Sequence, residues 1–374
     1  MTTIKLSAAG DVPITVPDGL SRETLEGFKP LNRWLGTLTR SLERQRTSPP
    51  HPFHADPYSL HKVTIQSFDL FGGQRLGFLK LQADVSNGGG GESLPGSVFL
   101  RGPSVAMLVL LVPDDVTSPE QVDAERRVVL TVQPRVPAGG LGFVELPAGM
   151  VDDSGTFAGA AAKEIEEELG GLVIEEAQLT NMSELAGAPD ARGKKTESDD
   201  EYADEEDLPE AVYPSAGGCD EFVPVFVHER RVPRRSLDDW AGKLTGLRDH
   251  GEKITLRLVR MRDLWREGRR DAKCLAAVAL WEGLRREVGG AFDSALEDIT
   301  HIIHAGSPVP MPTYDPMTEV FQPTLRNTEN VLAAALQTPT VQRVVITSSI
   351  AYDDVFTAYI TSKMVELHRT DDFV

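Results

Sequence analysis

The chain has 374 residues, a length that corresponds to about two globular domains. Because 40% of its residues are hydrophobic and 25% are charged, close to globular averages, the collagen-like, disulfide-scaffold and wholly disordered classes of protein are excluded. Its 57 acidic and 38 basic residues give a net charge of −19, which argues against a nucleic-acid partner and against a polybasic membrane surface. An anionic substrate stays compatible with this charge if a metal ion bridges it to the protein.

Cys219 and Cys274 are the only cysteines, and they fit no zinc-binding spacing, so we expect reduced structural thiols. The first residues lack the apolar run of a signal peptide. The longest apolar run, residues 105–112, is far shorter than a membrane span of about 20 residues. These features predict a cytoplasmic protein without a membrane partner.

The N-terminal part of the chain is predicted to be rich in β-structure with one helix. Apolar residues recur every three to four positions over residues 25–42, which predicts a helix that starts near Pro30. Alternating apolar residues then predict strands around residues 63–66 and 79–85, joined by a turn at Gly72-Gly73.

The middle of the chain predicts a sheet with helices. Continuous apolar runs at residues 104–112 and 128–133 indicate central strands, with a polar loop between them. Further strands are expected at residues 143–146, 222–227 and 254–259, and helices from residue 156 or 157 to 169 and from 271 to 288, the latter ending at Gly289-Gly290.

An acidic segment interrupts this pattern. Residues 190–210 contain ten acidic and three basic residues and show no periodicity. Such a composition predicts a solvated, disordered insertion, at about residues 188–211.

The residues that indicate chemistry are Glu164, Glu167 and Glu168, whose spacing places them on one face of the predicted helix. Three carboxylates on one face repel one another, and a divalent cation with a preference for oxygen ligands, Mg²⁺ or Mn²⁺, would offset that repulsion. From this spacing alone, a solvated acidic helix face is the alternative.

The surrounding sequence, GMVDDSGTFAGAAAKEIEEELG, resembles the Nudix box. The residues that match the family pattern in register are Gly149, Glu164, Ile165, Glu167, Glu168 and Gly170. Three positions depart from the pattern: Gly155 replaces a glutamate, Lys163 replaces an arginine, and Gly171 replaces an aliphatic residue.

The resemblance runs from about residue 28 to 288 and is to the ADP-sugar diphosphatase branch of Nudix hydrolases. Its motifs include FDLFGGQRLGFLKLQADV, VVLTVQPRVPAGGLGFVELPAGMVDD and YPSAGGCDEF. It implies an α/β fold, a Nudix α/β/α sandwich with a mixed sheet and a β-rich N-terminal extension that builds a homodimer. It also implies metal-dependent hydrolysis of ADP-sugars, such as ADP-glucose and ADP-ribose, to AMP and a sugar phosphate. The alternative is a non-catalytic Nudix-like module that binds an ADP-containing ligand.

The resemblance further implies a metal site. The carbonyl of Ala148 and the carboxylates of Glu164, Glu167 and Glu168 would bind Mg²⁺, or Mn²⁺ in its place.

It also implies which residues act on the substrate. Glu221 or Glu167 would align or deprotonate the attacking water, with Asp220 as the neighbouring alternative to Glu221. Arg101 and Arg135 would contact the nucleotide or its phosphates. Glu221 could instead cap a turn, and either arginine could be an ordinary residue at a strand end.

Residues 296–374 resemble part of another family, the extended short-chain dehydrogenase/reductases, through HIIHAGSPVP, RVVITSSIA and YITSK. Strands at residues 299–305 and 343–348 flanking a helix near 319–337 would form an incomplete Rossmann-like fragment.

The catalytic set of that family would be Ser348 or Ser349 with Tyr359 and Lys363. The glycine-rich dinucleotide turn is absent, and the chain stops soon after Lys363, so an NAD-dependent reductase or epimerase is the less favoured function.

Together these features predict three regions: an N-terminal extension over residues 1–95, a Nudix hydrolase domain over residues 96–290, and a partial dehydrogenase-like fragment over residues 291–374.

Overall fold

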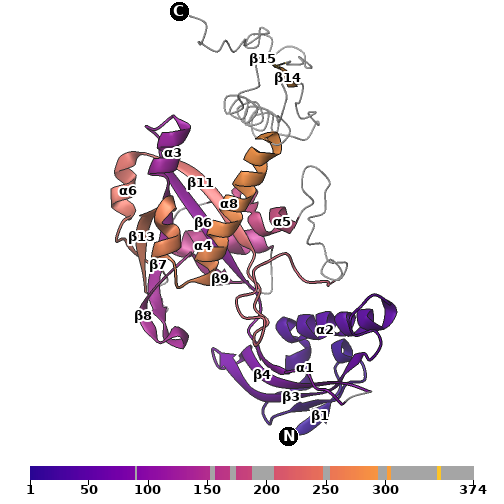
Figure 1. Ribbon diagram of the computed structural model, residues 1–374. Coiled ribbons are helices and arrows are strands. Elements are labelled where there is room, and N and C mark those ends of the chain that lie inside the picture. The colour runs from indigo at the N-terminus through magenta and orange to yellow at the C-terminus, as the bar shows by residue number, and fades with distance from the viewer. Residues whose placement is uncertain are drawn as a thin grey trace, which may run out of the picture. The chain divides into compact units, whose positions relative to one another are not determined.

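The structure is a computed structural model that describes residues 1–88, 91–151, 156–168, 174–187, 206–246, 253–293, 301–304 and 343–346 (Figure 1). The chain divides into two compact units, Met1–Trp281 and Glu282–Val374, and each is described by itself. The predicted insertion falls mostly on residues 188–205, which lie outside the described residues.

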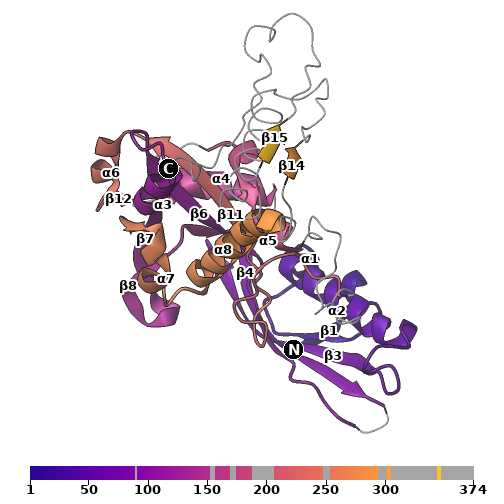
Figure 2. The same ribbon diagram turned by 45° about the horizontal axis from the view of Figure 1, so that its top comes forward.

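The first unit begins with a five-stranded sheet in the order β1-β2-β3-β4-β5, with helices packed on it (Figure 2). Its elements are β1 (Thr2–Ile4), η1 (Ser7–Ala9), β2 (Ile14–Val16), α1 (Arg22–Glu26), α2 (Lys29–Thr47), β3 (Tyr58–Phe71), β4 (Arg75–Asn87) and β5 (Ser97–Leu100). Pro30 lies in the first turn of α2, which confirms the predicted helix start. The two predicted strands are also present, and Gly72 and Gly73 form the turn between them with positive φ.

A separate core holds α2 on this sheet. Leu31 and Leu35 on one face of α2 are fully buried against Ile65 of β3 and Leu79 and Leu81 of β4. The N-terminal region therefore has enough apolar contact to form its own layer of helix on sheet.

The second sheet has eight strands and runs in the order β10-β11-β6-β7-β13-β12, with β8 paired to β7 and β9 paired to β6. Its strands are β6 (Ser104–Pro113), β7 (Arg127–Arg135), β8 (Gly140–Glu145), β9 (Ala148–Met150), β10 (Thr180–Asn181), β11 (Val225–Val232), β12 (Leu244–Thr245) and β13 (Ile254–Arg260). The sheet is mixed, because β11 is parallel to β6 while β7 is antiparallel to it. The two apolar runs of the sequence form the central strands β6 and β7, as predicted, and every residue of β6 is buried.

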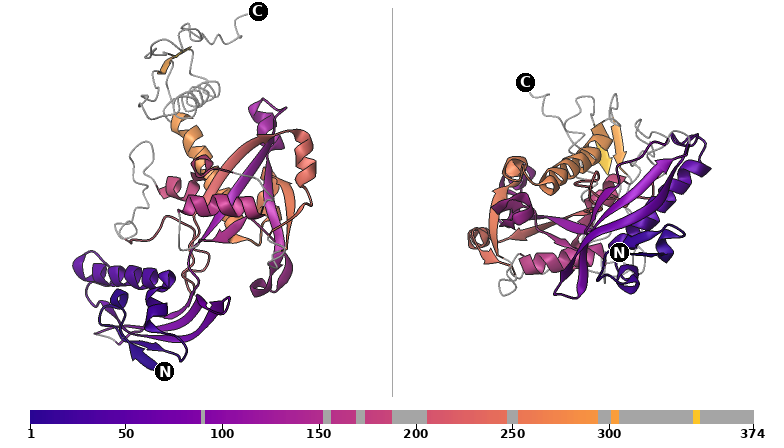
Figure 3. Two further views of the ribbon diagram at one scale, coloured as in Figure 1. Left: turned by 180° about the vertical axis from the view of Figure 1, so that it is seen from behind. Right: turned by 90° about the horizontal axis from the view of Figure 1, so that it is seen from below.

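Two helices cover opposite faces of this sheet. In Figure 1 the part of α8 (Ala272–Asp293) that belongs to the first unit, residues 272–281, lies in front of the sheet, and in the rear view of Figure 3 α4 (Phe157–Glu168) does. Ala161 and Ile165 of α4 are fully buried against Val105, Met107 and Val109 of β6. The predicted α/β/α arrangement with a mixed sheet is therefore confirmed.

Shorter helices complete the unit: α3 (Pro119–Glu125), η2 (Val136–Ala138), η3 (Glu176–Gln178), α5 (Met182–Gly187), α6 (Arg234–Trp240), η6 (Met261–Asp263) and α7 (Leu264–Glu267). In the described part of the chain, no helix combines the length and the apolar character that a membrane crossing requires.

Two local expectations were wrong. The segment between β6 and β7 is not only a loop, because α3 begins there. The Ser118 hydroxyl caps α3 by accepting from the N–H of Gln121, and Pro119 occupies its first turn. The predicted end of the helix at Gly289-Gly290 was also wrong, because α8 continues through these glycines to Asp293. A glycine costs only about 1 kcal/mol in a helix and does not block the backbone hydrogen bonds.

The second unit contains the strands β14 (His301–His304) and β15 (Arg343–Ile346), which pair in parallel from His301 opposite Arg343 to His304 opposite Ile346. A parallel pair needs a crossover connection, in agreement with the predicted strand–helix–strand order. The expected helix near residues 319–337 and the serine, tyrosine and lysine of the predicted catalytic set lie outside the described residues.

Replacing Leu108 by alanine should lower the free energy of unfolding by about 2–5 kcal/mol, because this fully buried side chain of β6 leaves a cavity. Leu141→Ala on β8 is the matched control, since Leu141 is 79% exposed, and it should change stability by less than about 0.5 kcal/mol. Denaturant unfolding followed by circular dichroism measures both. If both variants lost the same free energy of unfolding, the assignment of β6 to the core would be wrong.

Candidate functional site

The candidate site forms where α4 meets the short strand β9. Glu164 of α4 lies directly against Gly149 of β9: a Cβ added to Gly149 would lie 1.8 Å from the carboxyl carbon of Glu164. No larger residue than glycine fits at this position while Glu164 keeps its place. The absent side chain thus creates the space that the carboxylate occupies.

Glu168 lies one turn further along α4 and is only 2% exposed. One oxygen of its carboxylate accepts from the backbone N–H of Ala148 at 3.2 Å, and the other accepts from the amide of Gln133 at 3.4 Å. The carboxylate therefore joins α4 to both β9 and β7.

The arrangement fits a divalent cation that prefers oxygen ligands. Glu164 and Glu168 are both directed at β9, where the backbone of Ala148 lies. Carboxylate and carbonyl oxygens are the ligands that Mg²⁺ and Mn²⁺ prefer. The side chain of Glu167 lies outside the described residues, and the described ones contain no ready-made group of three or more His, Cys, Asp or Glu side chains for a metal ion.

Glu221 is held at the start of β6. Its carboxylate accepts from the hydroxyl of Ser104 at 2.7 Å and pairs with the guanidinium of Arg101 at 2.8 Å. Ser104 is the register partner of Met150 in β9, two residues from Ala148. Glu221 is therefore held at β6, which pairs with the strand β9 that the α4 carboxylates contact.

Asp220 has a different position from its neighbour. Its carboxylate accepts from the backbone N–H groups of Arg101 at 2.8 Å and Gly102 at 3.2 Å. Burial raises the pKa of Asp220 above its usual range, and these N–H groups oppose the rise. Because its oxygens fix backbone groups, Asp220 is less suited than Glu221 to act on water.

Arg135 also forms an ion pair, with its Nε 2.7 Å from Glu145. Burial alone would lower the pKa of Arg135, but the hydrogen bond and charge of Glu145, with the charges of Glu168 and Asp271, raise it above its usual value. The two arginines predicted to bind phosphate thus lie beside carboxylates.

A buried ionic network continues from Glu145. Lys273 of α8 donates to Glu145 and to Asp271, each at 2.9 Å, and Asp271 accepts the backbone N–H of Leu146 at 3.0 Å. Burial would lower the pKa of Lys273, but the charges of Asp271 and Glu145 raise it. The network links Arg135, through Glu145, to the start of α8.

Five supporting residues were not expected from the sequence: Ser104, Gln133, Glu145, Asp271 and Lys273. The one local signal among them was Asp271, the first residue of the predicted helix, whose side chain accepts from the N–H of Lys273 at 3.1 Å in the structure. Strand pairing brings Ser104, Gln133 and Glu145 to the site, and the first turn of α8 brings Lys273; no local spacing reveals either.

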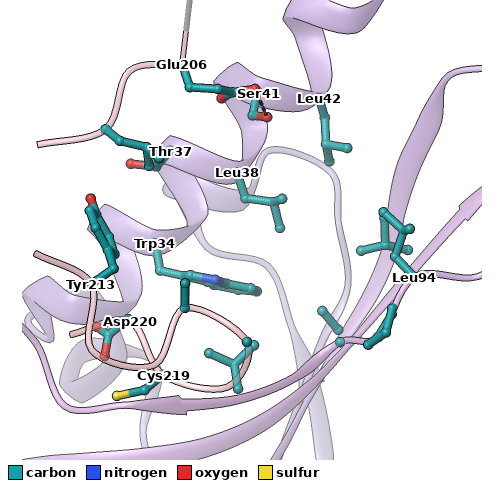
Figure 4. Close-up of a pocket in the computed structure, with 18 of the residues that line it drawn as sticks. Trp34, Thr37, Leu38, Ser41, Leu42, Leu94, Glu206, Tyr213, Cys219 and Asp220 are labelled. Atoms are coloured by element: carbon teal, nitrogen blue, oxygen red, sulfur yellow. Dashed lines mark hydrogen bonds between the residues drawn. The ribbon is translucent and has the colours of Figure 1, made fainter. Parts of the chain in front are cut away.

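A pocket of about 640 Å³ lies beside this site (Figure 4). Its lining includes Trp34, Leu38 and Leu42 of α2, Ala83 and Val85 of β4, and Tyr213, Cys219, Asp220 and Phe222. The walls are mainly apolar, and Figure 4 shows the indole of Trp34 lying across the pocket. At the rim, the Ser41 hydroxyl donates to Glu206 at 3.0 Å.

Phe222 connects the pocket with the candidate metal site. Its ring centroid lies 5.9 Å from that of Tyr213 and 5.8 Å from that of Phe157, the first residue of α4. The guanidinium of Arg33 lies over the same ring at 5.2 Å. The residue that follows Glu221 in the chain thus lines the pocket.

Comparisons with known proteins show which sequences and structures the chain is similar to. The family model described as the NUDIX domain matches residues 116–272, which confirms the predicted Nudix domain. The chain is 40% identical over 230 residues to "Nudix hydrolase 14, chloroplastic" of Arabidopsis thaliana, covering 61% of this chain and 64% of that protein. The chain thus spans just under two thirds of that relative's length.

Two further similarities are shorter or more distant. The chain is 48% identical over 63 residues to "NAD-dependent epimerase/dehydratase ALT6" of Alternaria alternata, covering 17% of this chain and 18% of that protein. A solved structure described as "Crystal structure of ADP compounds hydrolase" is 19% identical with a TM-score of 0.34, covering 62% of this chain and 97% of that chain, a similarity too distant for a structural argument.

Replacing Gly149 by alanine should turn the Glu164 carboxylate away from β9, because the new methyl group overlaps it. The free energy of unfolding should change by about 1 kcal/mol or less, because the end of a flexible side chain can move at low cost. Gly142→Ala on β8 is the matched control, since an added Cβ there meets nothing within 4 Å. Crystal structures of both variants check the position of Glu164. If Glu164 kept its place in Gly149→Ala, the close approach of its carboxylate to β9 would be wrong.

Proposed function

We propose that the Nudix domain of this chain hydrolyses the diphosphate bond of ADP-sugars, such as ADP-glucose and ADP-ribose, and releases AMP and a sugar phosphate. The observation that carries the proposal is the convergence of Glu164 and Glu168 at β9, beside the strand that holds Glu221. The relative with 40% identity is named a Nudix hydrolase, which supports hydrolysis. Its name gives no substrate, so the choice of ADP-sugars rests on the sequence motifs and on the pocket.

The metal would be held by Glu164, Glu168 and the carbonyl of Ala148, with Glu167 as a further ligand. When bound, Mg²⁺ or Mn²⁺ would offset the charge of the diphosphate and lower the pKa of a bound water. The buried Glu168 suits this role, because a divalent cation would compensate the cost of keeping a carboxylate away from water.

Glu221 would accept the proton of the attacking water. Ser104 and Arg101 fix its carboxylate in one orientation, which leaves lone pairs free for that proton. Attack of the water oxygen on one phosphorus forms a new P–O bond and breaks the bond to the bridging oxygen, which leaves with the other phosphate. Glu167 is the alternative proton acceptor.

Arg101 and Arg135 would bind phosphate oxygens. A guanidinium has five N–H donors, so its pairing with one carboxylate leaves donors for a phosphate. The buried Nε of Arg101 has no hydrogen-bond partner within the described parts of the chain, which fits such a role.

The pocket beside Asp220 would take the nucleoside end of the substrate. Trp34 and Tyr213 offer flat aromatic surfaces for a base, and the volume of about 640 Å³ is in the range of small-molecule sites. Phe222 places this pocket next to Glu221, so one substrate could reach both.

The alternative function is a non-catalytic module that binds an ADP-containing ligand. It is motivated by Gly155 and Lys163, which depart from the family pattern. Release of AMP in the presence of Mg²⁺ separates the two functions, because a binding module would hold the ligand without cleaving it.

The remaining expectations stay predictions. A homodimer and the lack of a nucleic-acid or membrane partner are inferred from the sequence. The name of the Arabidopsis relative places that protein in the chloroplast, so an organelle is an alternative to the cytoplasm. The short match to an epimerase/dehydratase fits the motifs of residues 296–374, for which we propose no dehydrogenase activity.

Purified chain should release AMP from ADP-glucose or ADP-ribose when Mg²⁺ or Mn²⁺ is present, and a panel of nucleoside diphosphate sugars would define its preference. Glu168→Gln should lower turnover by about 100-fold or more and leave the fold intact, because the amide keeps the shape but loses the charge that binds metal. Glu184→Gln on α5 is the control, since Glu184 is exposed. Normal turnover by Glu168→Gln would contradict the site assignment.

Trp34→Ala should raise the KM for ADP-sugars by about 5- to 150-fold and change kcat less, because stacking of a base on an aromatic ring contributes about 1–3 kcal/mol. Trp265→Ala is the control, since Trp265 is half exposed on α7 and does not line the pocket. Steady-state kinetics with ADP-glucose measures both variants. An unchanged KM in Trp34→Ala would place the nucleoside elsewhere.

A further inference from the structure

The ionic network at the start of α8 is deeply buried. Glu145 is 2% exposed and Asp271 is 3% exposed, and their charges are balanced by Lys273 and Arg135. Burying several charges is costly, and an ion pair in a protein interior often stabilises no more than apolar residues of the same size. A contribution to the stability of the fold therefore does not by itself explain why these charged residues are buried here.

That position is the turn that leads into β9. Glu145 is held through its side chain, and Leu146 through its backbone N–H, which donates to Asp271. The carbonyl of Pro147 accepts from Met107 of β6 at 3.0 Å, and the N–H of Ala148 donates to Glu168. Four consecutive residues are therefore fixed, each by a different contact.

The turn is fixed by the helices that cover the two faces of the sheet. Asp271 directly precedes α8 and Lys273 lies in its first turn, whereas Glu168 belongs to α4. If the contacts from α8 are lost, the backbone at Leu146 can shift, and Ala148 then loses its alignment with the Glu168 carboxylate. A shift of a fraction of an ångström is enough to weaken a metal site.

We propose that Asp271 and Lys273 are positioning residues that hold the turn of residues 145–148, and thereby align the Ala148 carbonyl with Glu164 and Glu168 for a divalent cation. This inference rests on the proposed function, because it assigns the network to that same metal site. The two residues act through the backbone of Leu146 and through Glu145 and touch neither substrate nor metal.

The test is the affinity of the full-length chain for Mn²⁺ without substrate, measured by calorimetry, together with thermal unfolding. Asp271→Ala should weaken Mn²⁺ binding at least about tenfold and lower kcat more than it raises KM. Asp271→Asn keeps an oxygen that can accept from Leu146, so it should retain the fold and part of the affinity. Lys273→Met should also weaken Mn²⁺ binding.

The matched control is Arg126→Met, at the other end of β7. Arg126 is similarly buried and pairs with Glu229 at 2.6 Å and with Asp123, so its loss should lower thermal stability. Its Mn²⁺ affinity should stay within about twofold of the unaltered chain, because site effects are local.

Two outcomes would overturn the proposal in different ways. If folded Asp271→Ala and Lys273→Met bind Mn²⁺ as tightly as the unaltered chain, the network is structural only, whatever the chain hydrolyses. If the unaltered chain binds no Mn²⁺, the proposed metal site fails and the positioning role fails with it. Weak Mn²⁺ binding in both variants, with normal binding in Arg126→Met, supports the proposal even if ADP-sugars are not the substrates.

Discussion

The contact on which the site depends is the buried carboxylate of Glu168. By accepting from Ala148 and from Gln133, it joins α4 to β9 and to β7. The apolar contacts of α4 with the sheet, such as those of Ala161 and Ile165, are not directional. The hydrogen bonds fix how far α4 lies along the sheet, and so they determine where Glu164 meets Gly149. The buried carboxylate of Glu168 thus determines the position of Glu164 relative to β9.

Much of the framework could be predicted from the sequence, because it follows from local periodicity. The apolar runs of β6 and β7, the proline at the start of α2 and the stripe of α4 each specify an element through their immediate neighbours. The strands β14 and β15 were expected from their own apolar runs, and their parallel pairing agrees with the predicted strand–helix–strand order. The helix α3 was missed, although Ser118 and Pro119 carry a start signal, because its polar composition suggested a loop.

The site could be predicted only in its named carboxylates. Glu164, Glu168 and Glu221 were expected, and the structure brings the first two to β9 and binds the third to Ser104. Whether they bind metal and act on water is still a prediction. The partners that hold them come from strands and helices far apart in the chain, such as Asp271, which is 125 positions from Leu146. The spacing of residues along one sequence does not reveal contacts between residues so far apart in the chain.

The segment around Glu221 has one further consequence. Asp220 and Phe222 line the pocket, whereas Glu221 between them pairs with Arg101. Because the three residues are consecutive, a substitution that moves the backbone of this part of the pocket wall also moves the Glu221 carboxylate. Substitutions at Asp220 and at Phe222 should therefore have non-additive effects on the position of Glu221. The side chain of Trp34 on α2 reaches the same pocket from the N-terminal sheet and its helices. A substitution of Trp34 can therefore change the pocket without moving Glu221.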